Sequence, residues 1–593
     1  MCGFIGIVTK EKTTNNILSE NNRIICRGPD ETKNLKSSDD EINIDFLFNR
    51  LSILELSSNG SQPMVSEDGD HIMMFNGEIF NYIELKKYLK EHNTSFVSKN
   101  SDAEVLFLGL RKEGKEFIKK LIGQFSIVYL DKSKKEILLV RDRTGQKPLF
   151  YSYNKKNIYF GSNLKSVSNI SNSFNLNLDG LREFLNLGVV TSPNTIFNNV
   201  YKVNPGEMIT FHYGQEFEKS KYRYWNPNDY ISENVNFNDK DFDDIVSDSL
   251  EIRLRSDVPV AAFCSGGLDS TLIIKKLSNL GHQIPTFSVI NKNPKYDERK
   301  FIKQVTDKYA TEITMKEVDT EACFDDILEN ISVFDEPYMD ASNFPSSFIS
   351  KQISTDYKVA ISGDGGDEIF FGYERFQNEF NSSKLFENLV DFLYWIYPSW
   401  LGTGNKILKF NKNYKKSYAS YFEDLKFLNF LGFKYKSNFA SKYLSNSDTK
   451  FKNIIILENQ FYLSEMMNLK VDRTSMNYSL EVRSPFIDHR LIEYILSCRS
   501  ESINYKKSKK YVKDYLAEDF TPEFLNRKKM GFVFDLESII FSEQDRVIEI
   551  INNSGLNKYI PKLNIKKLFL RKSRINSLRI YKLLILAEFI KNK

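Results

Sequence analysis

The stretch from Val258 to Ser270 constrains the fold of this 593-residue chain more than any other. An apolar run, Val258 to Phe263, is typical of a buried strand, and it leads through Gly266 and Gly267 into a helix-like pattern from Leu268 to Leu277. A buried strand, a turn and a helix form the unit from which parallel sheets flanked by helices are built. The sequence therefore predicts an α/β domain whose ligand lies at the carboxyl end of this strand.

The same turn carries groups that bind phosphates. Gly266 and Gly267 let the main chain approach a ligand closely, and the unpaired N–H groups at the helix start favour an anion. Ser265 and Ser270 add hydroxyl donors. Asp269 would repel a bare phosphate, so it indicates a metal ion between the carboxylate and the phosphates. An ordinary strand-to-helix turn is the alternative, but the two serines and the aspartate favour a nucleotide site.

A second glycine-rich loop follows a later apolar run. The runs Pro285 to Ile290 and Tyr357 to Ile361 are predicted strands, and the second leads into Ser362-Gly363-Asp364-Gly365-Gly366-Asp367-Glu368. An acidic surface loop is the alternative interpretation, but its place after a buried strand favours a role with metal and nucleotide. Asp269 and Asp367 are the candidates to share Mg²⁺ on a pyrophosphate.

Composition excludes several function classes. A chain of 593 residues is too long to fold around a single hydrophobic core, so several domains are expected. The 82 basic and 78 acidic residues nearly balance and give no overall signal for nucleic acid. A local basic run between Lys562 and Arg579 is typical of a solvated helix face. Five scattered cysteines without a Cys-x-x-Cys pair, and five dispersed histidines, argue against a disulfide framework and a zinc site.

The sequence gives no signal for export or membrane insertion. The N-terminus lacks a basic-then-apolar signal pattern. The most apolar stretch, Leu385 to Leu401, is interrupted by Glu387, Asp391 and Pro398 and falls short of the ~20 apolar residues that a membrane helix needs. We predict a buried aromatic helix there. A cytoplasmic protein without membrane or nucleic-acid partners is expected.

Cys2 stands directly after Met1 and begins an apolar, strand-like run that would hold the terminus inside the fold. Removal of Met1, which a small second residue permits, leaves Cys2 with both a thiol and a free α-amine. An α-amine has a reference pKa near ~7.7–8.0 and can take the thiol proton around neutral pH. One residue then supplies nucleophile and base, as in N-terminal nucleophile enzymes.

Three further segments suit the binding of an amino acid. Arg50 offers a guanidinium fork for a carboxylate. Asn76 and Gly77 place an amide and a backbone N–H side by side, as an oxyanion hole requires. Glu78 and Asp102 together suit an α-ammonium group, although the segment that carries Asp102 also fits a plain helix N-cap. An amino acid with a cleavable side-chain amide matches this set of charges.

Five motifs follow one another in the first part of the chain: Cys2-Gly3-Phe4-Ile5-Gly6, Arg27-Gly28-Pro29-Asp30, Arg50-Leu51-Ser52-Ile53, Asn76-Gly77-Glu78-Ile79 and Arg141-Asp142-Arg143-Thr144-Gly145-Gln146-Lys147-Pro148-Leu149. Most of residues 2–216 thereby resembles the class II glutamine amidotransferases. The resemblance implies an N-terminal nucleophile (Ntn) hydrolase αββα sandwich, with glutamine hydrolysis through a γ-glutamyl thioester on Cys2 and release of ammonia. It also implies a glutamine pocket lined by Arg50, Leu51, Ile53, Leu54, Asn76, Gly77, Glu78 and Asp102.

Two positions depart from the pattern of that family. Cys26 stands where histidine is usual, and Asn163 stands where glutamate is common. Neither residue belongs to the predicted chemistry, so the departures leave the assignment intact.

The second part of the chain adds motifs in a fixed order: Phe334-Asp335-Glu336-Pro337, Asp472-Arg473, Leu480-Glu481-Val482-Arg483-Ser484-Pro485-Phe486-Ile487-Asp488, Lys510-Tyr511 and Arg527-Lys528-Lys529-Met530-Gly531-Phe532. With the two glycine loops they resemble the ATP-pyrophosphatase domain of glutamine-dependent asparagine synthetases. The pairing of both halves in one chain is more specific than either half.

This resemblance implies a Rossmann-like parallel sheet with extra helices, and it assigns the ATP site residue by residue. Phe263, Val289, Ser362 and Gly363 would contact the nucleotide. Pyrophosphate would be bound by Ser265, Gly266, Gly267, Asp269 and Ser270, with Lys510 neutralising its charge. Asp364 falls where the family places an acid that the adenylate step needs.

The motifs and the two resemblances together predict an amidotransferase domain over residues 1–216, a linker over 217–240 and a synthetase domain over 241–593. The expected function is asparagine synthesis from aspartate, glutamine and ATP with Mg²⁺, and a homodimer is one expected assembly. An amidotransferase acting on another carboxylate, such as a sugar acid, shares every motif and stays open. A regulatory relative that only senses ligands is disfavoured by the intact sites, and β-lactam-forming relatives generally lack the N-terminal cysteine.

The sequence assigns few residues to the pocket that would bind the acceptor carboxylate. Arg473, Arg483 and the segment from Tyr338 to Asn343 are its candidates, although arginines in such settings are as often structural.

Overall fold

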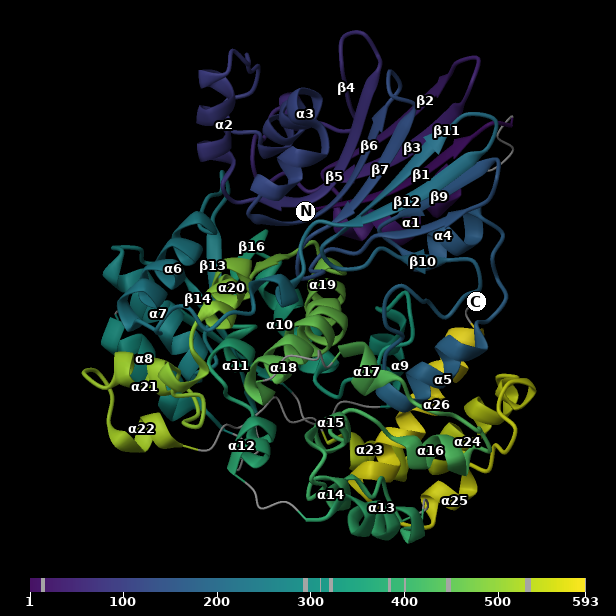
Figure 1. The fold of residues 1–593 in the computed structure, drawn as a ribbon, viewed down its shortest axis with the longest axis vertical. Helices are drawn as coiled ribbons and strands as arrows, with labels where there is room; N and C mark the ends of the chain where they lie inside the picture. Colours follow the sequence, from purple (N-terminus) through teal and green to yellow (C-terminus); the bar gives the residue numbers. More distant parts are fainter. Residues whose placement is uncertain are drawn as a thin grey trace.

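The structure of the protein is a computed structural model that describes residues 1–11, 16–291, 297–309, 311–318, 324–381, 385–398, 401–443, 449–527 and 535–591. Two antiparallel sheets occupy one end of the molecule, and a parallel sheet with many helices occupies the rest (Figure 1). The N-terminus lies where these two parts meet.

The first sheet places β1 near its middle. Its strands, in spatial order, are β10 (Tyr201–Lys202), β8 (Phe150–Tyr153), β9 (Asn157–Gly161), β1 (Cys2–Thr9), β3 (Asn43–Arg50) and β2 (Glu31–Ser38). The second sheet consists of β12 (Phe217–Arg223), β11 (Glu207–Tyr213), β7 (Glu136–Arg141), β6 (Gly123–Asp131), β5 (His71–Ile79) and β4 (Met64–Val65).

The two sheets pack face to face and carry helices on their outer faces. Apolar side chains from both sheets, among them Phe46 and Leu139, form one buried cluster between them. Outside the second sheet lie α2 (Tyr82–Glu91) and α3 (Asp102–Glu113). Outside the first sheet lie α1 (Asn21–Ile24) and α4 (Leu164–Ile170). The four layers confirm the predicted αββα sandwich.

The segment predicted as a linker, residues 217–240, begins with a strand. β12 pairs with β11 along its whole length and forms the edge of the second sheet. The chain then leads through the 3-10 turn Pro227–Tyr230 to α6 (Asp239–Ile252). The folded N-terminal unit therefore extends past residue 216 to Arg223.

The C-terminal part is built on a five-stranded parallel sheet. Its order is β15 (Ile313–Val318), β14 (Thr286–Asn291), β13 (Val260–Phe263), β16 (Val359–Ile361) and β17 (Glu481–Arg483). The predicted strands at 258–263, 285–290 and 357–361 correspond to β13, β14 and β16 and are confirmed. β15 and β17 were not predicted as strands, because both carry charged residues and β17 has only three residues.

Helices cover both faces of this sheet. One face packs on α10 (Asn343–Ile353). The other face is covered chiefly by α6, α7 (Leu268–Asn279), α8 (Arg299–Tyr309), α20 (His489–Ser497) and α21 (Lys510–Leu516). The predicted α/β domain is thus confirmed.

A second helical cluster extends away from the sheet and contains the extra helices that the resemblance implied. Its long central helix is α26 (Arg574–Lys591). Around it lie α5 (Leu178–Leu187), α9 (Phe324–Ser332), α16 (Leu425–Phe430), α23 (Leu536–Ser542), α24 (Gln544–Asn553) and α25 (Lys566–Phe569). The remaining helices of this part include α12 (Glu374–Asn381), α18 (Lys450–Leu457), the π-helical segment Glu458–Met467 and α19 (Asn468–Met476).

The prediction of a buried aromatic helix within Leu385 to Leu401 is wrong. The helix α13 (Glu387–Ile396) exists, but Trp395 is 77% exposed and Phe392 is 57% exposed. Only Val390 is fully buried, because the helix packs through one side on α14 (Asn405–Leu408) and leaves its other side uncovered. Within the described part of the chain, none of the helices combines the length and the apolar character that crossing a membrane would require.

Candidate active sites

Cys2 lies at the start of β1, opposite Arg50 of β3, and is almost fully buried. Its backbone N–H donates to Asn76 Oδ1 at 3.0 Å, and its carbonyl accepts from Arg27 Nε at 3.2 Å. The nitrogen held by Asn76 is the atom that becomes the α-amine once Met1 is removed. Asn76 therefore fixes the group that would serve as the base.

The environment of the thiol disfavours its charged form. Burial raises the pKa of Cys2, while the nearby α-ammonium of Met1 and the Arg50 guanidinium oppose that rise. The thiol is therefore mostly protonated at neutral pH, and it needs a base before it can attack a substrate.

The predicted oxyanion hole is built on a close approach of two strands. Gly77 has a φ of +147°, and a Cβ there would lie 1.9 Å from the carbonyl oxygen of Gln124 on β6. Only glycine fits such an approach. The amide nitrogen of Asn76 faces Ser126 Oγ at 3.4 Å, which is a long contact that a developing oxyanion could replace.

The Arg50 guanidinium is buried under the loop that follows β3. Its Nη1 donates to the carbonyl of Ser57 at 2.9 Å, and its Nη2 contacts the carbonyl oxygens of Leu54 and Glu55. A Cβ on Gly60 would lie 2.1 Å from Nη2, so this glycine makes room for the guanidinium.

The predicted pocket residues on this loop face two directions. Leu51 and Ile53 pack with Met1 against Val359 of the parallel sheet, whereas Leu54 lies in the core beneath the second antiparallel sheet. The structure thus does not place all three side chains along one surface. The loop instead joins the amidotransferase half to the synthetase half.

Glu78 and Asp102 lie close together as predicted, and both are buried. Asp102 accepts from the backbone N–H of Ile79 at 3.0 Å and of Ala103 at 2.8 Å. Burial raises the pKa of Asp102 to about 6. Burial also raises the pKa of Glu78 well above its usual range, and the charge of Asp102 adds to that rise. A substrate ammonium between them would favour both carboxylates. The predicted helix N-cap is also present, since Ser101 Oγ accepts from the N–H of Glu104.

The N-terminus reaches into the synthetase half. The α-ammonium of Met1 lies 3.0 Å from Glu481 Oε2 of β17, and both groups are fully buried. Arg483 holds the other carboxylate oxygen of Glu481 at 2.6 Å and lies 3.5 Å from Glu78. Burial opposes ionisation, but the Met1 ammonium and Arg483 lower the pKa of Glu481 to about 2. A chain of alternating charges thus connects the glutamine pocket to the parallel sheet.

A second buried ion network crosses the interface beside Cys2. Arg27 donates to both carboxylate oxygens of Asp472 on α19, at 2.8 and 2.9 Å. Arg473 pairs with the same Asp472 and with Asp335, each at 2.7 Å. Burial opposes ionisation of Asp472, but Arg27 and Arg473 hold its pKa well below the usual range. Motifs more than 440 residues apart in the sequence therefore form one contact.

We predict that Asp472→Asn weakens the docking of the two halves. The substitution leaves the buried cations Arg27 and Arg473 without their carboxylate, and loss of one partner from a buried network costs about 3–5 kcal/mol. Urea unfolding should show a lower midpoint or a separate early transition. The exposed Asp356→Asn serves as the control, and an unchanged unfolding curve for Asp472→Asn would contradict the role given to this network.

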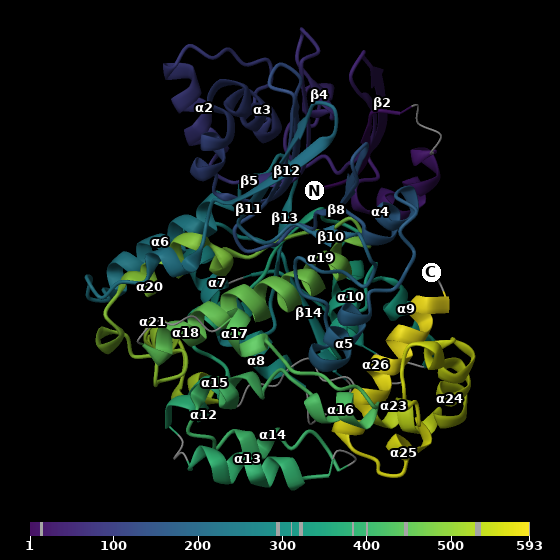
Figure 2. The same ribbon diagram turned by 45° about the vertical axis from the view of Figure 1, so that its right-hand side comes forward.

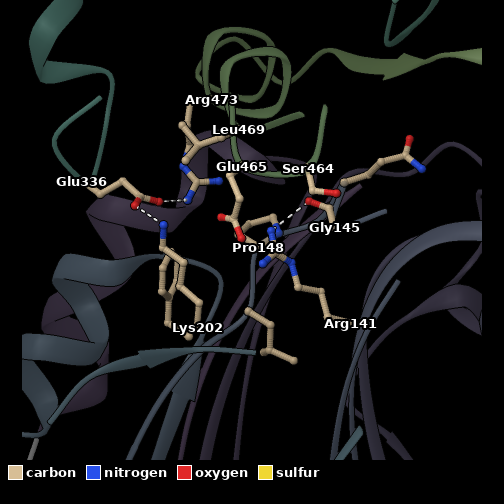
Figure 3. A pocket seen from close by; sticks show the side chains of 12 residues that line it. Arg141, Gly145, Pro148, Lys202, Glu336, Ser464, Glu465, Leu469 and Arg473 are labelled. Carbon is tan, nitrogen blue, oxygen red and sulfur yellow. Dashed lines mark hydrogen bonds and ion pairs between the residues drawn. The ribbon is translucent and has the colours of Figure 1, made fainter. Parts of the chain in front are cut away.

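A small cavity lies between the two halves (Figure 3). Arg141, Pro148 and Lys202 reach it from the N-terminal half, and Glu465 and Arg473 reach it from the other half. Lys202 and Glu336 pair across the interface at 2.5 Å. Arg473, which lines the cavity, pairs with Asp472, and Asp472 in turn pairs with the Arg27 that contacts Cys2.

The turn after β13 has the form that the sequence predicted. Gly266 has a φ of +66°, and Gly267 caps the start of α7. The N–H of Gly267 donates to Ser265 Oγ at 3.2 Å, and the hydroxyls of Ser265 and Ser270 lie 3.1 Å apart. The turn therefore gathers two hydroxyls and the first N–H groups of a 12-residue helix at one point.

The loop after β16 packs directly on this turn. A Cβ on Gly366 would lie 2.6 Å from Asp269 Cγ, and one on Gly363 would lie 3.2 Å from Asp269 Cβ. Asp364 turns back on its own loop, where its carboxylate accepts from Ser362 Oγ. Phe263 ends β13, and Val289 lies on the neighbouring β14. The two loops thus meet as adjacent strand ends of a parallel sheet should.

A lysine lies between the two predicted metal-binding acids. Lys509 Nζ is 2.5 Å from Asp269 Oδ2 and 2.7 Å from Asp367 Oδ1, and a Cβ on Gly372 would lie 1.9 Å from Asp367 Oδ1. Two adjacent carboxylates in a glycine-lined cradle suit Mg²⁺, which binds through one or two carboxylates and substrate phosphates. Among the described residues, no group of three or more His, Cys, Asp or Glu is placed to hold a metal ion. A metal ion at Asp269 and Asp367 would therefore need the substrate phosphates as further ligands.

The structure places Lys510 away from the site that the resemblance implied. Lys510 pairs with Asp514 on the exposed side of α21, and its neighbour Lys509 faces the acids. Lys509 has a φ of +52° at the start of this helix, which directs its side chain inward. Sequence reasoning could not separate two adjacent lysines. Of the predicted motif that begins at Arg527, Lys528 to Phe532 lie outside the described residues, and Arg527 donates to the carbonyl of Gly266.

The remaining predicted positions have structural roles. Arg473 and Arg483 are consumed by the buried ion networks, so they give no view of an acceptor pocket. Tyr338 donates to the carbonyl of Met466 and lies in the core. Cys26 is half-buried, with its carbonyl accepting from Ser479, and Asn163 caps α4 by accepting from the N–H of Ser166.

The glutamine pocket and the nucleotide loops lie at opposite ends of the parallel strands. Met1, Leu51 and Ile53 pack against Val260 and Val359, which begin β13 and β16. The glycine loops follow the other ends of the same two strands. A nitrogen atom that passed from Cys2 to the nucleotide would therefore travel along the length of this sheet.

Comparison with known proteins identifies the family. The sequence profile described as asparagine synthase matches residues 241–585, more than half of the chain. The chain belongs to the asparagine synthase family. The profile described as a glutamine amidotransferase domain matches residues 1–225. Members of the asparagine synthase family use ATP, in agreement with the two glycine loops.

Individual relatives cover most of this asparagine synthase family member. "Asparagine synthetase [glutamine-hydrolyzing] 1" of Bacillus subtilis is 28% identical over 95% of this chain and 92% of its own. "Putative asparagine synthetase [glutamine-hydrolyzing] 2" of Methanocaldococcus jannaschii is 35% identical over 63% of this chain and 76% of its own. Among solved structures, "Structure of the allosteric regulatory enzyme of purine biosynthesis" matches 53% of this chain and 80% of its own at 13% identity, with a TM-score of only 0.28.

Proposed function

We propose that this chain is a glutamine-dependent asparagine synthetase, which converts aspartate, glutamine and ATP into asparagine, glutamate, AMP and pyrophosphate. The observation that carries the proposal is the joining, in one chain, of an N-terminal cysteine site to the domain that carries a pair of nucleotide loops, through buried ion pairs that do not involve Met1. The family and the names of the relatives support aspartate as the acceptor over a sugar acid.

Glutamine hydrolysis begins at Cys2 after Met1 is removed. Arg50 would bind the α-carboxylate of glutamine, and Glu78 with Asp102 would bind its α-ammonium. The α-amine of Cys2, oriented by Asn76, takes the thiol proton, and the thiolate attacks the side-chain amide carbonyl. Collapse of the tetrahedral intermediate releases ammonia and leaves a thioester, which water then hydrolyses to glutamate.

The nucleotide loops would activate the acceptor carboxylate. A carboxylate is anionic and has no good leaving group, so ammonia does not displace its oxygen directly. Attack of the aspartate side chain on the α-phosphorus of ATP forms β-aspartyl-AMP and releases pyrophosphate, and ammonia then displaces AMP. Ser265, Gly267, Ser270 and Lys509 would bind the leaving pyrophosphate. Asp269 and Asp367 would hold Mg²⁺, which neutralises charge on that leaving group when it is bound.

The released nitrogen is proposed to stay inside the protein. Ammonia is mostly protonated in water at pH 7 and is then a poor nucleophile, so exclusion of water between the sites would keep it reactive. The observation that motivates this step is the packing of Leu51 and Ile53, on the loop after β3, against the first residues of β13 and β16. Asparagine made from labelled glutamine in unlabelled ammonium should keep the label, and full equilibration with external ammonium would exclude an enclosed route.

Product analysis tests the acceptor. Purified chain lacking Met1 is incubated with ATP, Mg²⁺, glutamine and aspartate, and the products are identified by mass spectrometry. Asparagine formed with stoichiometric AMP is the expected result. Glutamine hydrolysis and ATP cleavage that require a different carboxylic acid would favour an amidotransferase with another acceptor. Absence of glutamine hydrolysis would favour a sensor without catalytic activity.

Glutamine hydrolysis should weaken as the pH falls below about 6. The pKa of Asp102 in the free protein is about 6 because the group is buried, so below that pH the carboxylate takes up a proton and loses the charge that attracts the substrate ammonium. The Cys2 α-amine must also be neutral to act as the base, so its protonation already lowers kcat/KM for glutamine at higher pH, and below about 6 the slope should steepen by about a further tenfold per pH unit. Asp102→Asn is expected to lower kcat/KM on the plateau and to remove this added steepening. The exposed Glu91→Gln on α2 should keep it, and steepening that persists in Asp102→Asn would assign the titration to another group.

A further inference from the structure

The end of the molecule farthest from the two antiparallel sheets carries an apolar surface. Both views place α13, α14 and α25 at that end (Figures 1 and 2). The apolar surface consists of large side chains that are between 38% and 84% exposed: Leu385, Phe386, Leu389, Phe392, Leu393, Trp395, Ile396, Phe410 and Leu570. Neither the glutamine site nor the nucleotide loops use any of these residues.

The acidic residues of α13 share one cation. Glu387 and Asp391 both pair with Lys416, at 2.8 and 2.7 Å, so the three groups together carry a single negative charge. Val390 faces the core. The outward side of the helix presents aromatic and aliphatic groups, Phe392 and Trp395 foremost among them.

Positive charge gathers on the same end. Residues 392–422 and 550–587 together contain 14 Lys and Arg and no Asp or Glu, in a chain whose net charge is only +4. The two segments meet in space, because a Cβ on Gly402 would lie 3.3 Å from Ile575 Cδ1. Lys416 and nine others of these basic side chains are exposed. We call those nine the basic rim: Lys406, Lys412, Lys558, Lys562, Lys566, Lys567, Arg571, Lys572 and Arg574.

We propose that this end of the molecule binds the surface of an anionic phospholipid membrane, with the apolar surface entering the headgroup region and the basic rim contacting lipid phosphates. Trp and Phe beside a rim of Lys and Arg are the side chains that interfacial membrane helices use. The binding is peripheral, since α13 has only 10 residues.

Charge decides between this ligand and two others. A second copy of the chain on this face would bring two basic rims together, because a symmetric contact pairs each patch with itself. A nucleic acid would satisfy the rim but leave aliphatic groups such as Leu389, Ile396 and Leu570 without a partner. An anionic bilayer satisfies both kinds of group.

Vesicle binding tests the proposal. The full chain is mixed with phosphatidylcholine vesicles with and without phosphatidylglycerol, and binding is followed by co-sedimentation and by tryptophan emission. We expect at least ~10-fold tighter binding to the anionic vesicles, weakened by salt, with a blue shift that Trp395→Phe reduces. Equal binding to both vesicle types, or no binding, would overturn the proposal.

Matched variants locate the contact. Phe392→Ser with Trp395→Ser, and separately Arg571→Gln with Lys572→Gln, should each lower binding to anionic vesicles about tenfold or more. The exposed Phe174→Ser and the pair Lys33→Gln with Lys36→Gln, all on the N-terminal half, should leave it unchanged. Retained glutamine hydrolysis shows that each variant is folded.

Three outcomes of these variants would overturn the membrane assignment. The first is equal loss of vesicle binding in the control variants. The second is RNA binding that depends on the basic rim while vesicles do not bind. The third is a concentration-dependent dimer that the Phe392 and Trp395 substitutions abolish while vesicles do not bind.

Discussion

Replacement of Cys2 by Ala should abolish glutamine hydrolysis and glutamine-dependent amide synthesis while ammonia-dependent synthesis continues. The thiol is the predicted nucleophile, and the charges of the predicted glutamine-pocket residues Arg50 and Asp102 act on it, whereas those of Arg27, Asp472 and Asp335 act on Cys26. Loss of a covalent nucleophile typically lowers kcat by at least ~10³-fold. The synthetase loops lie at the far ends of β13 and β16, so their chemistry should not need the thiol.

The measurement compares two nitrogen sources in one assay. Release of glutamate reports hydrolysis, and release of AMP and pyrophosphate with excess ammonium reports the synthetase half. Cys26→Ala provides a matched control, because Cys26 is a half-buried thiol on the neighbouring 3-10 turn. Retained hydrolysis in Cys2→Ala would remove the N-terminal nucleophile mechanism. Loss of both activities would mean that the buried Cys2 side chain also supports the packing of the N-terminal half.

Sequence periodicity predicted the parts of the fold that bury continuous apolar runs. The strands β13, β14 and β16 and the helix α7 were readable because both faces of a parallel sheet are covered and its central strands are therefore apolar. β17 was not readable, because its buried charges Glu481 and Arg483 neutralise Met1 and Glu78 instead of contacting water. Charge in a strand ordinarily signals exposure, and here tertiary pairing overrides that signal.

The prediction that the aromatic helix α13 is buried was wrong for the opposite reason. Its apolar residues predicted burial, because burial of Phe and Trp is the usual outcome of the hydrophobic effect. Sequence alone cannot show whether a partner surface exists to cover them. In this fold α14, the loop at Gly404 and Lys416 contact one side of the helix, and Trp395 on the other side stays exposed.

The residue types of both sites were predictable, but their partners were not. Arg27 and Asp472 belonged to separate motifs, and nothing in their spacing indicates that they form one bidentate pair between the halves. The choice between Lys509 and Lys510 depends on where α21 begins, and helix boundaries are the least certain part of a sequence reading. Long-range pairing and side-chain direction are properties of the folded chain.

Asp367→Asn should lower ATP-pyrophosphate exchange by about 10²- to 10³-fold and leave glutamine hydrolysis intact. Asp367 and Asp269 share the cation Lys509 at 2.7 and 2.5 Å, so this cradle binds positive charge through two carboxylates. Removal of one carboxylate weakens the hold on Mg²⁺ and on the leaving pyrophosphate, where a single electrostatic contact is typically worth that much in rate. The Mg²⁺ concentration needed for half-maximal activity should also rise.

The two adjacent lysines give the sharpest version of this test. Lys509→Ala removes the cation that lies between Asp269 and Asp367, so we expect exchange to fall by about 10²-fold. Lys510→Ala removes only an exposed pair with Asp514, and exposed pairs contribute little, so activity should stay within about twofold. The exposed Asp307→Asn controls for general charge changes in this domain. If Lys510→Ala is instead the damaging substitution, the side chain that contacts pyrophosphate is the one that the family resemblance implied, and α21 must present its first turn differently when ATP is bound.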